Sequence, residues 1–344
     1  MTQSIQIRHL VATDAARWDA FVDQHPDATF FHRAGWKTVL EQAFEHDAPY
    51  LFAESNGEIC GVLPLGHVRS RLFGNALVST PFCVYGGSVG ASVEVCDQLD
   101  AAACRLAEER RVNHLELRYH APRHDGWPRK ALHVTFRKPI DPDPEQNLLA
   151  IPRKQRAMVR KGIQARLVSR LDGGVDAVHR AYSESVRNLG TPVFSRRYFR
   201  ILKAVFGDDC EALTVHDGQR LVAGVLNFYF RDEVLPYYGG GTAAARQLKA
   251  NDFMYWEVMR RACERGCRLF DFGRSKIDTG AFDFKRNWGF EPQPLSYEFH
   301  LIRATQVPDV NPLNPKYRLF IEGWKRLPLP ISQVLGPLLS RSLG

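Results

Sequence analysis

The pattern that decides the fold lies in residues 236–292, PYYGGGTAAARQLKANDFMYWEVMRRACERGCRLFDFGRSKIDTGAFDFKRNWGFEP. A short apolar strand ends in three glycines, and a segment with apolar residues at helical spacing follows. A second β-prone segment, 268–272, ends at Gly273, and the dozen residues after it are predicted to form a cationic loop. Strand, helix and strand followed by a polar loop is the arrangement in which α/β folds bind ligands.

The side chains of this loop suit an anionic substrate. A guanidinium binds phosphate or carboxylate through two parallel hydrogen bonds, and an ammonium acts as a point charge. The residues concerned are Arg274, Ser275, Lys276, Lys285 and Arg286.

The composition is that of a globular protein large enough for two domains. The chain has 344 residues, of which 44% are hydrophobic and 24% are charged, and a chain of this length ordinarily forms more than one core. Its net charge is +8, which favours contact with polyanions or with an acidic membrane surface.

Several functional classes are disfavoured by the motifs. The seven cysteines include no C-x-x-C pair, so reduced structural thiols are predicted, with neither a zinc site nor a disulfide framework. His120 and His124 have a spacing seen in metal sites, but too few further ligands accompany them, so no metal is predicted. The glycines match neither the P-loop nor the dinucleotide-binding spacing, and no tightly bound cofactor is expected.

The sequence predicts a cytoplasmic protein, with peripheral contact to the inner membrane left open. The first residues lack the basic start and the apolar core of a secretory signal. No stretch reaches the length that spans a bilayer. A monomer is expected.

An internal duplication organises the chain into two copies of one α+β unit, with mixed sheets flanked by helices. The first matched pairs lie 161 to 163 positions apart, and the later ones 153 to 155 apart. They are Phe31 with Phe194, Trp36 with Phe199, Phe44 with Phe206, Asn56 with Asp217, Gly61 with Gly224, Tyr85 with Tyr238, and Arg111 with Gly266. The predicted domains are 1–144, 145–305 with a basic helix at its start, and a tail, 306–344.

Two basic segments each allow two interpretations. The run that begins at Arg153 and includes Arg156 contains no acid, so it is either a solvated helix face or a phosphate-binding surface. The tail, 311–344, combines Leu, Phe, Ile and Trp with five cations and one acid. It is either an amphipathic segment on an anionic membrane or a pair of helices packed on the body.

Nearly the whole chain resembles the FemAB-like proteins, and most closely the branch associated with exosortase/PEP-CTERM systems. The resemblance rests on PVFSRRYF (192–199), LKANDFMYWEVMRRACERGCRLFDFGRS (248–275), GAFDFKRNWGF (280–290) and NPKYRLFIEGWKRLPLP (314–330). It implies two acyltransferase domains of the GCN5-related (GNAT) fold. Characterised members of the family transfer an aminoacyl group from a charged tRNA to an amine of a peptidoglycan precursor.

The resemblance also implies roles for individual residues. Lys285 matches the lysine of the family's F-K-x-x-[FW]-G motif, which lies near the transferred acyl group and the tRNA end. Arg274 and Ser275 belong to the matching F-G-R-S block, and Lys249, Asn251 and Asp252 to the start of the preceding helix. The expected substrate-binding set is Arg274, Ser275, Lys249, Asn251, Arg286, Arg153 and Arg156. Lys37 stands at approximately the place of a precursor-binding lysine in the first domain, so the acceptor stays open.

The expected mechanism is direct aminolysis in a ternary complex. The reaction needs a neutral amine, a carbonyl held against it and stabilisation of the oxyanion. The sequence contains no G-x-S-x-G motif and no evident Cys-His pair, so no covalent intermediate is predicted. Lys285 or a backbone N–H would contact the oxyanion, and Tyr238 or Asp271 would relay the amine's proton. For Asp271 a structural role is favoured, because its counterpart in the first copy is Glu116.

The function therefore has alternatives. An N-acyltransferase acting on an amine of a cell-envelope precursor or an exopolysaccharide-linked substrate is preferred. Its donor is acyl-CoA or aminoacyl-tRNA, and the lack of a clean [RQ]-x-x-G-x-[GA] pyrophosphate loop favours tRNA. A non-catalytic membrane- or RNA-binding module and a structural accessory of envelope assembly are the other hypotheses.

Overall fold

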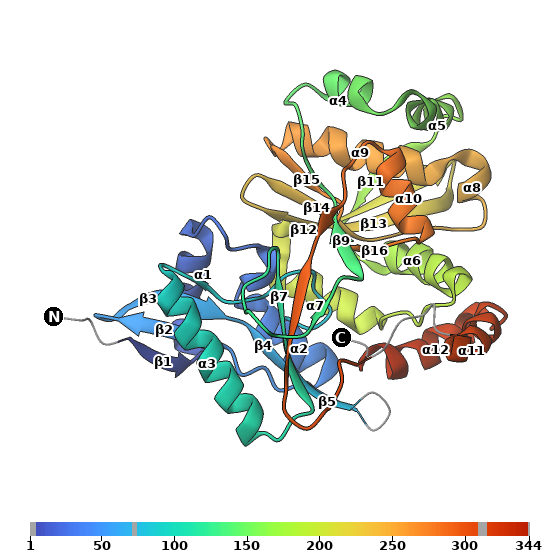
Figure 1. Cartoon of the computed structure of the whole chain (residues 1–344). Helices are drawn as coiled ribbons and strands as arrows, with labels where there is room; N and C mark the ends of the chain where they lie inside the picture. Colours follow the sequence, from blue (N-terminus) through green and yellow to red (C-terminus); the bar gives the residue numbers. More distant parts are fainter. Residues whose placement is uncertain (1–4, 71–73, 309–314, 343–344) are drawn as a thin grey trace. The chain divides into compact units, whose positions relative to one another are not determined.

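The chain divides into two units, each with its own sheets and core (Figure 1). The computed structural model describes residues 5–70, 74–308 and 315–342. Unit 1 contains Met1–Ala131, Pro294–Asp309 and Ser342–Gly344, and unit 2 contains Leu132–Gln293 and Val310–Arg341.

Unit 2 is built on a six-stranded mixed sheet. All neighbouring strands are antiparallel except β14 and β15, which are parallel. The strands, in their order across the sheet, are β10 (Arg137–Pro139), β15 (Leu269–Asp271), β14 (Glu233–Gly241), β13 (Arg220–Phe230), β12 (Cys210–Asp217) and β11 (Val168–Asp172). The short strands β9 (His133–Thr135), β16 (Ser275–Lys276) and β17 (Gln293–Pro294) form a further small sheet.

Helices cover both faces of the unit 2 sheet (Figure 1). A side chain at Gly224 of β13 would meet Val178 of α6, whereas one at Gly239 of β14 would meet Met254 of α9. The glycines thus allow the two helices to pack closely on opposite faces. The helices of unit 2 as a whole are α4 (Pro144–Ala150), α5 (Arg153–Gln164), α6 (Asp176–Leu189), α7 (Arg196–Phe206), α8 (Ala245–Leu248), α9 (Ala250–Glu264), α10 (Gly280–Asn287), α11 (Pro315–Lys325) and α12 (Leu329–Ser340).

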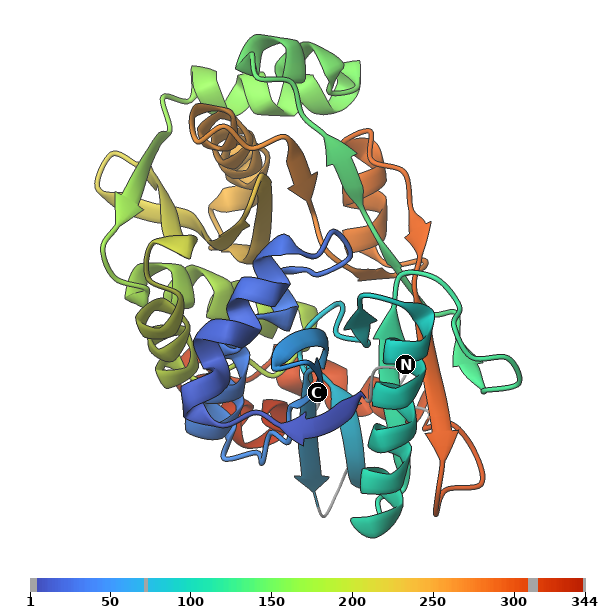
Figure 2. The same ribbon diagram turned by 90° about the vertical axis from the view of Figure 1, so that its left-hand side faces the viewer.

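Unit 1 repeats this strand order in two separate sheets. One sheet contains β1 (Gln6–His9), β2 (Leu51–Ser55), β3 (Glu58–Leu63) and β6 (Val89–Gly90). The other contains β4 (Leu65–Ser70), β5 (Gly74–Ser79), β7 (His114–Tyr119), β18 (Ser296–Leu301) and β8 (Arg129–Lys130). Its helices are α1 (Ala15–Gln24), α2 (Gly35–Phe44) and α3 (Val93–Glu109), and α3 packs on β3 (Figure 2).

The matching elements confirm the duplicated α+β architecture expected from the sequence. The β2–β3 hairpin turns at Asn56 and Gly57, whose φ angles of 53° and 81° explain the Asn-Gly pair. Its counterpart is the β12–β13 hairpin. The 11-residue strand β13 corresponds to β3 and β4 together, which Pro64 separates because proline cannot donate to the strand ladder.

The unit boundaries differ from the predicted ranges 1–144, 145–305 and 306–344. β18 pairs with β7 from Ser296 opposite Tyr119 to Leu301 opposite His114, so 294–309 belongs to unit 1. β10 pairs with β15, so unit 2 begins at Leu132. In the described part of the tail, α11 and α12 pack on α6 within unit 2. Each copy therefore contributes one strand to the sheet of the other.

No described helix is long and apolar enough to cross a bilayer. All seven cysteines are free thiols. Within the described ranges, no group of three or more His, Cys, Asp or Glu side chains has an arrangement that could hold a metal ion.

Candidate active site

The parallel strands β14 and β15 separate at their carboxyl ends. They pair only at Glu233 with Leu269 and at Val234 with Phe270, whereas β14 continues to Gly241 alongside β13. Beyond Val234, the edge of β14 that faces β15 has no strand partner in the described sheet. Backbone groups on such an edge can hydrogen-bond a ligand, and the carboxyl ends of diverging strands are a usual ligand position in α/β folds.

A β-bulge lies where β14 leaves β15. The register passes from Leu226 opposite Tyr238 to Asn227 opposite Pro236, so Tyr237 is the extra residue. Asn227 is fully buried, and neither its amide nitrogen nor its amide oxygen has a hydrogen-bond partner among the described residues. An unsatisfied buried polar group costs about 1–3 kcal/mol, so a ligand that reached Asn227 would gain from satisfying it.

Lys285 is held at the carboxyl end of β15 by α10. The segment predicted as a loop contains this helix, because the Thr279 hydroxyl caps it by accepting a hydrogen bond from the Phe282 N–H at 3.4 Å. The Lys285 Nζ donates to the carbonyl oxygens of Gly273 and Arg274 at 2.9 and 3.0 Å. The prediction of a loop at Lys285 is therefore wrong, while its place after β15 is the expected one.

The surroundings of Lys285 act on its protonation in opposite directions. The Nζ lies 5.5 Å from the centroid of the Phe136 ring and 5.9 Å from that of Phe272, and both rings favour the protonated amine. Burial, with a smaller contribution from the nearby Arg274, lowers the pKa of Lys285 to about 7. The Asp271 carboxylate acts in the opposite direction. Near neutral pH this amine thus exists in both protonation states, which is the property required of a proton-transfer group.

Asp271 is buried and heavily engaged. Its Oδ1 accepts hydrogen bonds from the Gly273 N–H at 2.7 Å and from the Thr135 hydroxyl at 3.4 Å. Its Oδ2 lies 3.4 Å from Nε of Arg137 on β10. The carboxylate thus links β15 to two neighbouring segments and acts electrostatically on Lys285, which are structural and positioning contacts.

Four other residues of the expected substrate-binding set, Ser275, Asn251, Lys249 and Arg286, differ in burial and in bonding. Ser275 is buried, and its hydroxyl has no hydrogen-bond partner among the described side chains and backbone groups. The buried Oδ1 of Asn251, in the first turn of α9, likewise has none, and a side chain at Gly241 would meet this atom. Lys249 precedes α9 in the left-handed conformation with a φ of 57°. Arg286 is exposed, and its guanidinium lies 5.5 Å from the Phe282 ring centroid.

The basic helix α5 packs against α9 (Figures 1 and 2). Gly162 permits the contact, because a side chain there would meet Phe253. Gln155 of α5 donates to Asp252 of α9, which also accepts from Nε1 of Trp288 at 3.3 Å. These contacts connect α5 to the helix that follows β14 and, through Trp288, to the end of α10.

The outer face of α5 is cationic. Arg153 is exposed, and Arg156 is partly buried with its Nη1 donating to the Leu149 carbonyl at 2.8 Å. The other exposed cations of the run are Lys154, Arg160, Lys161 and Arg166.

Two predicted site residues lie elsewhere. Tyr238 points toward α6 and α7: its hydroxyl lies 2.8 Å from that of Tyr198, and its ring contacts Tyr182 and Phe199. The structure therefore does not bring Tyr238 to Lys285. Lys37 belongs to unit 1, where its Nζ donates to Glu41 and to the Ala48 carbonyl, both at 2.6 Å.

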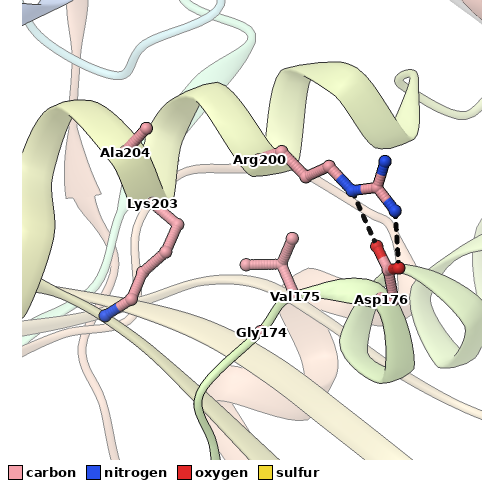
Figure 3. A pocket seen from close by; sticks show the side chains of 6 residues that line it. All are labelled: Gly174, Val175, Asp176, Arg200, Lys203 and Ala204. Carbon is pink, nitrogen blue, oxygen red and sulfur yellow. Dashed lines mark hydrogen bonds and ion pairs between the residues drawn. The ribbon is translucent and has the colours of Figure 1, made fainter.

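A hollow of about 260 Å³ lies between α6 and α7 and contains none of the predicted site residues (Figure 3). An ion pair between Asp176 and Arg200, at 2.7 Å, crosses one side of it. Lys203, on another side, donates to the carbonyls of Gly207 and Cys210 at 2.9 and 2.8 Å. The hollow is on the α6 face of the sheet, away from α9 and α10.

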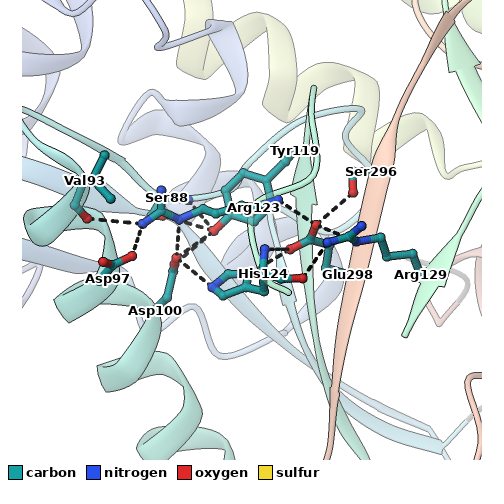
Figure 4. Close-up of polar contacts among 10 residues, drawn as sticks. All are labelled: Ser88, Val93, Asp97, Asp100, Tyr119, Arg123, His124, Arg129, Ser296 and Glu298. Atoms are coloured by element: carbon teal, nitrogen blue, oxygen red, sulfur yellow. Dashed lines mark hydrogen bonds and ion pairs between the residues drawn. The ribbon is translucent and has the colours of Figure 1, made fainter. Parts of the chain in front are cut away.

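Unit 1 has a closed polar cluster after β7, the counterpart of β15 (Figure 4). Glu298 is fully buried and accepts hydrogen bonds from the backbone N–H groups of Arg123 and His124 at 2.8 and 2.9 Å. It also contacts Arg129, at 3.1 Å, and the Ser296 hydroxyl, at 2.9 Å.

His124 joins the two carboxylates of this cluster. Its Nδ1 lies 2.7 Å from Glu298 and its Nε2 lies 3.2 Å from Asp100. Asp100 in turn binds Arg123 at 2.8 Å and accepts from the Tyr119 hydroxyl at 3.0 Å. The carboxylates hold the pKa of His124 above its usual value despite the opposing effect of burial.

Sequence reasoning missed Asn227 as a candidate site group, and it named Asp252 only as part of the block at the start of the helix. Asn227 is the one amide in the apolar strand VLNFYF (225–230), which was a usable signal. Asp252 is buried, and burial raises its pKa. Nothing in its local sequence shows that Trp288 and Gln155 would enclose it, because those contacts depend on the tertiary packing of α5 and α10.

The comparisons with known proteins agree with this fold. Residues 150–286 match the family model described as an acetyltransferase (GNAT) domain, a domain type that uses acyl-CoA as a substrate. This match confirms the expected enzyme class, an acyltransferase. A search of curated proteins found no significant match.

Solved structures with the same fold have low sequence identity to this chain. The structure of FemX is similar with a TM-score of 0.67 and 14% identity, over 87% of this chain and 98% of that one. L-PGS from Bacillus licheniformis has a TM-score of 0.56 at 12% identity, over 96% and 97%. A tandem GNAT protein from the clavulanic acid biosynthesis pathway has a TM-score of 0.54 at 14% identity, over 88% and 100%. The expected tandem GNAT-like fold is thereby confirmed.

Proposed function

We propose that this protein is a FemAB-like N-acyltransferase that transfers an acyl or aminoacyl group to an amine by direct aminolysis. The single observation that carries the proposal is Lys285, a partly buried amine held by two backbone carbonyls at the carboxyl end of β15, where its pKa is lowered to about 7. The matched GNAT domain, 150–286, includes this residue. The similarity to FemX supports the fold of such an enzyme.

In the proposed mechanism, the donor carbonyl lies between the diverging ends of β14 and β15. The acceptor amine attacks that carbonyl, forming the new C–N bond, and the ester or thioester bond to the carrier breaks. Neutral Lys285 accepts the proton that the amine loses as the C–N bond forms, and in its protonated form it stabilises the oxyanion. It then gives this proton to the leaving oxygen or sulfur of the carrier as the ester or thioester bond breaks, which returns Lys285 to the neutral state. Backbone N–H groups on the free edge of β14, together with the amide of Asn227, supply further donors for the carbonyl oxygen.

The donor carrier is polyanionic in this proposal. The exposed cations of α5 lie on a helix that packs against α9 and contacts Trp288 through Asp252, next to α10. Cations in such a position suit the phosphates of either coenzyme A or a tRNA acceptor end. The missing pyrophosphate-loop pattern favours an aminoacyl-tRNA, whereas the matched domain type favours acyl-CoA, and the experiment below distinguishes them.

The proposed acceptor is an amine of a cell-envelope precursor or of an exopolysaccharide-linked substrate, as in exosortase/PEP-CTERM systems. Lys37, which the resemblance relates to precursor binding, is paired with Glu41 in unit 1. Binding of an acidic precursor by Lys37 would require that ion pair to open. We propose that the protein acts as a monomer.

Transfer of radiolabel tests this proposal. Purified protein is incubated with labelled aminoacyl-tRNA or labelled acyl-CoA and an envelope-precursor extract, and product label is counted for wild type, Lys285→Met and Lys203→Met. Lys203 is a matched control, because it also donates to two backbone carbonyls of unit 2 but lies on the α6 face.

Transfer from one donor that is lost in Lys285→Met and retained in Lys203→Met is the expected result, and it identifies the donor. Equal transfer by both variants would remove Lys285 from the mechanism. No transfer by wild type from either donor, with binding of tRNA intact, would instead favour an RNA-binding module.

A further inference from the structure

In helix α12 the small residues face the protein, and the large apolar residues face outward. Ser332, Gly336 and Ser340 recur every fourth residue and are buried. Val334 and Leu338 are 69% and 64% exposed. A helix that only covered a protein core would have the opposite orientation.

Specific contacts with unit 2 fix this orientation. Gly336 lies so close to Val193 that a side chain there would be 2.8 Å from the Val193 backbone nitrogen and oxygen. The Ser340 hydroxyl donates to the Val193 carbonyl at 3.1 Å. The small residues are therefore required on the inner side, and the outward direction of the apolar residues follows from a packed contact.

The preceding helix α11 is held in a similar way. A side chain at Gly190, at the end of α6, would meet Ile321, and Arg187 donates to the carbonyls of Lys325 and Leu327 at 3.5 and 3.4 Å. Trp324 is buried, whereas Leu319 and Phe320 are 85% and 44% exposed. We define the outer apolar face by its exposed residues, Leu319, Phe320, Ile331, Val334, Leu335 and Leu338.

Cations accompany the outer apolar face. Arg326 is exposed in the connection between α11 and α12, and Arg341 follows α12 directly. Lys325 pairs with Glu322 at 2.9 Å, and Glu322 is the single acid of residues 311–344. The local charge is thus positive, and exposed apolar side chains on helices that also carry positive charge have the chemistry that an anionic bilayer surface recognises.

We propose that the outer apolar face of α11 and α12 docks on an anionic lipid surface. A second copy of this chain is a less favourable occupant, because an isologous contact would bring the same cations together. A lipid surface accepts the apolar side chains at the level of the acyl boundary and the cations at the headgroups. The proposal does not depend on the proposed transfer reaction.

Sedimentation with vesicles tests the docking. The full chain is mixed with vesicles of phosphatidylcholine alone or of phosphatidylcholine with phosphatidylglycerol, and the bound fraction is measured at low and high salt. We expect binding to the anionic vesicles, weakened at least about tenfold by Val334→Ser/Leu338→Ser and roughly fivefold to tenfold by Arg326→Glu.

The matched control is Val168→Ser/Leu171→Ser, which removes two side chains of unit 2 that are 47% and 50% exposed on β11. This control should bind as wild type does. Circular dichroism melting of each variant checks that it folds, and Arg326→Glu keeps the test decisive should the double variant of α12 not fold.

Two results would overturn the proposal. One is a wild-type protein that sediments with neither vesicle type. The other is a dimer in analytical ultracentrifugation that Val334→Ser/Leu338→Ser dissociates, since a second copy would then occupy this face.

Discussion

The carboxyl ends of β15 in unit 2 and of β7 in unit 1 occupy equivalent places in the two copies but have opposite character. After β7, the buried carboxylates of Asp100 and Glu298 are each bound by several donors. After β15, Lys285 is a partly buried amine that donates hydrogen bonds to two backbone carbonyl oxygens, and the hydroxyl of Ser275 has no partner in the described part of the chain. One place is internally satisfied, and the other retains unused hydrogen-bonding capacity.

The difference shows how the two copies of a duplicated fold can have different roles, one in stability and the other in ligand binding. A satisfied buried network contributes to the stability and specificity of its unit and leaves no group for a ligand. Unsatisfied buried groups lower stability, and they are retained where a ligand or a reaction uses them. We therefore expect substitutions after β7 to act on folding and substitutions after β15 to act on transfer.

The largest effect on stability is expected for Glu298→Ala. Its removal leaves His124 and Arg129 without their fully buried partner, which should lower the free energy of unfolding by about 3 kcal/mol. Urea unfolding followed by circular dichroism measures this, and the rate of transfer per folded molecule should stay near that of wild type. An unchanged midpoint would show that the cluster does not hold β18 in place.

Lys285→Met should instead lower the rate of transfer much more than it lowers stability. Loss of an oxyanion-stabilising or proton-transferring group lowers kcat/KM roughly 10²- to 10³-fold. The free energy of unfolding at neutral pH should fall by no more than about 2 kcal/mol, because two hydrogen bonds to carbonyls are lost. Initial rates with the donor identified by the label assay, together with urea unfolding, provide the comparison; a collapse of stability without a specific rate defect would contradict it.

The pH dependence of stability should also run in opposite directions in the two units. The pKa of Lys285 is lowered from 10.5 to about 7 on folding, so the folded state binds fewer protons between these values. The stability of wild type relative to Lys285→Met should therefore rise from pH 7 toward pH 10. The pKa of His124 is raised above 6.5, so its contribution is complete below pH 6.5 and is lost as pH rises through the folded value.

Urea midpoints of wild type, Lys285→Met and His124→Asn across this pH range measure both trends. The contribution of His124 is also lost at low pH, because His124 pairs with the Glu298 carboxylate. The pKa of Glu298 is depressed below 4.5 in the folded state, so the stabilisation by Glu298 is lost as pH falls through that depressed value. Parallel curves for the two variants would contradict the assigned protonation behaviour.

The smallest effects on stability are expected for the substitution of two buried serines, and the two effects should differ. Ser296→Ala removes a hydroxyl that donates to Glu298 at 2.9 Å and should cost about 1 kcal/mol. Ser275→Ala removes a hydroxyl without a partner among the described residues, so it should leave stability unchanged or slightly higher. Thermal melts test the pair, and an increase in KM in Ser275→Ala alone would indicate that this hydroxyl binds substrate.

Local signals allowed much of the fold to be predicted from the sequence. The strand–helix–strand pattern around 236–272 depends on neighbouring residues, and the structure contains it as β14, α9 and β15. The internal matches predicted the duplication. The pairing of β18 with β7 was not predicted, because it joins segments about 180 residues apart and no local pattern specifies a distant partner.

The candidate site was predicted in part. Lys285 was placed correctly after β15, but α10 was taken for a loop although Thr279 offered a cap signal. Tyr238 was misplaced because the bulge at Tyr237 and the packing of α6 and α7 decide its direction. A period of two residues along a strand predicts which side chains share a face only while the register is regular.

The crossed contribution of β10 and β18 has a consequence for synthesis on the ribosome. Glu298, which completes the cluster after β7, is 175 residues later in the chain than Arg123. At about 5–20 residues per second, roughly 10–35 s pass between the emergence of the two segments. During that time β7 has an open edge that another nascent chain could pair with. The N-terminal copy therefore cannot finish before the C-terminal one is made, and a gene cut between the two would encode neither as an independent domain.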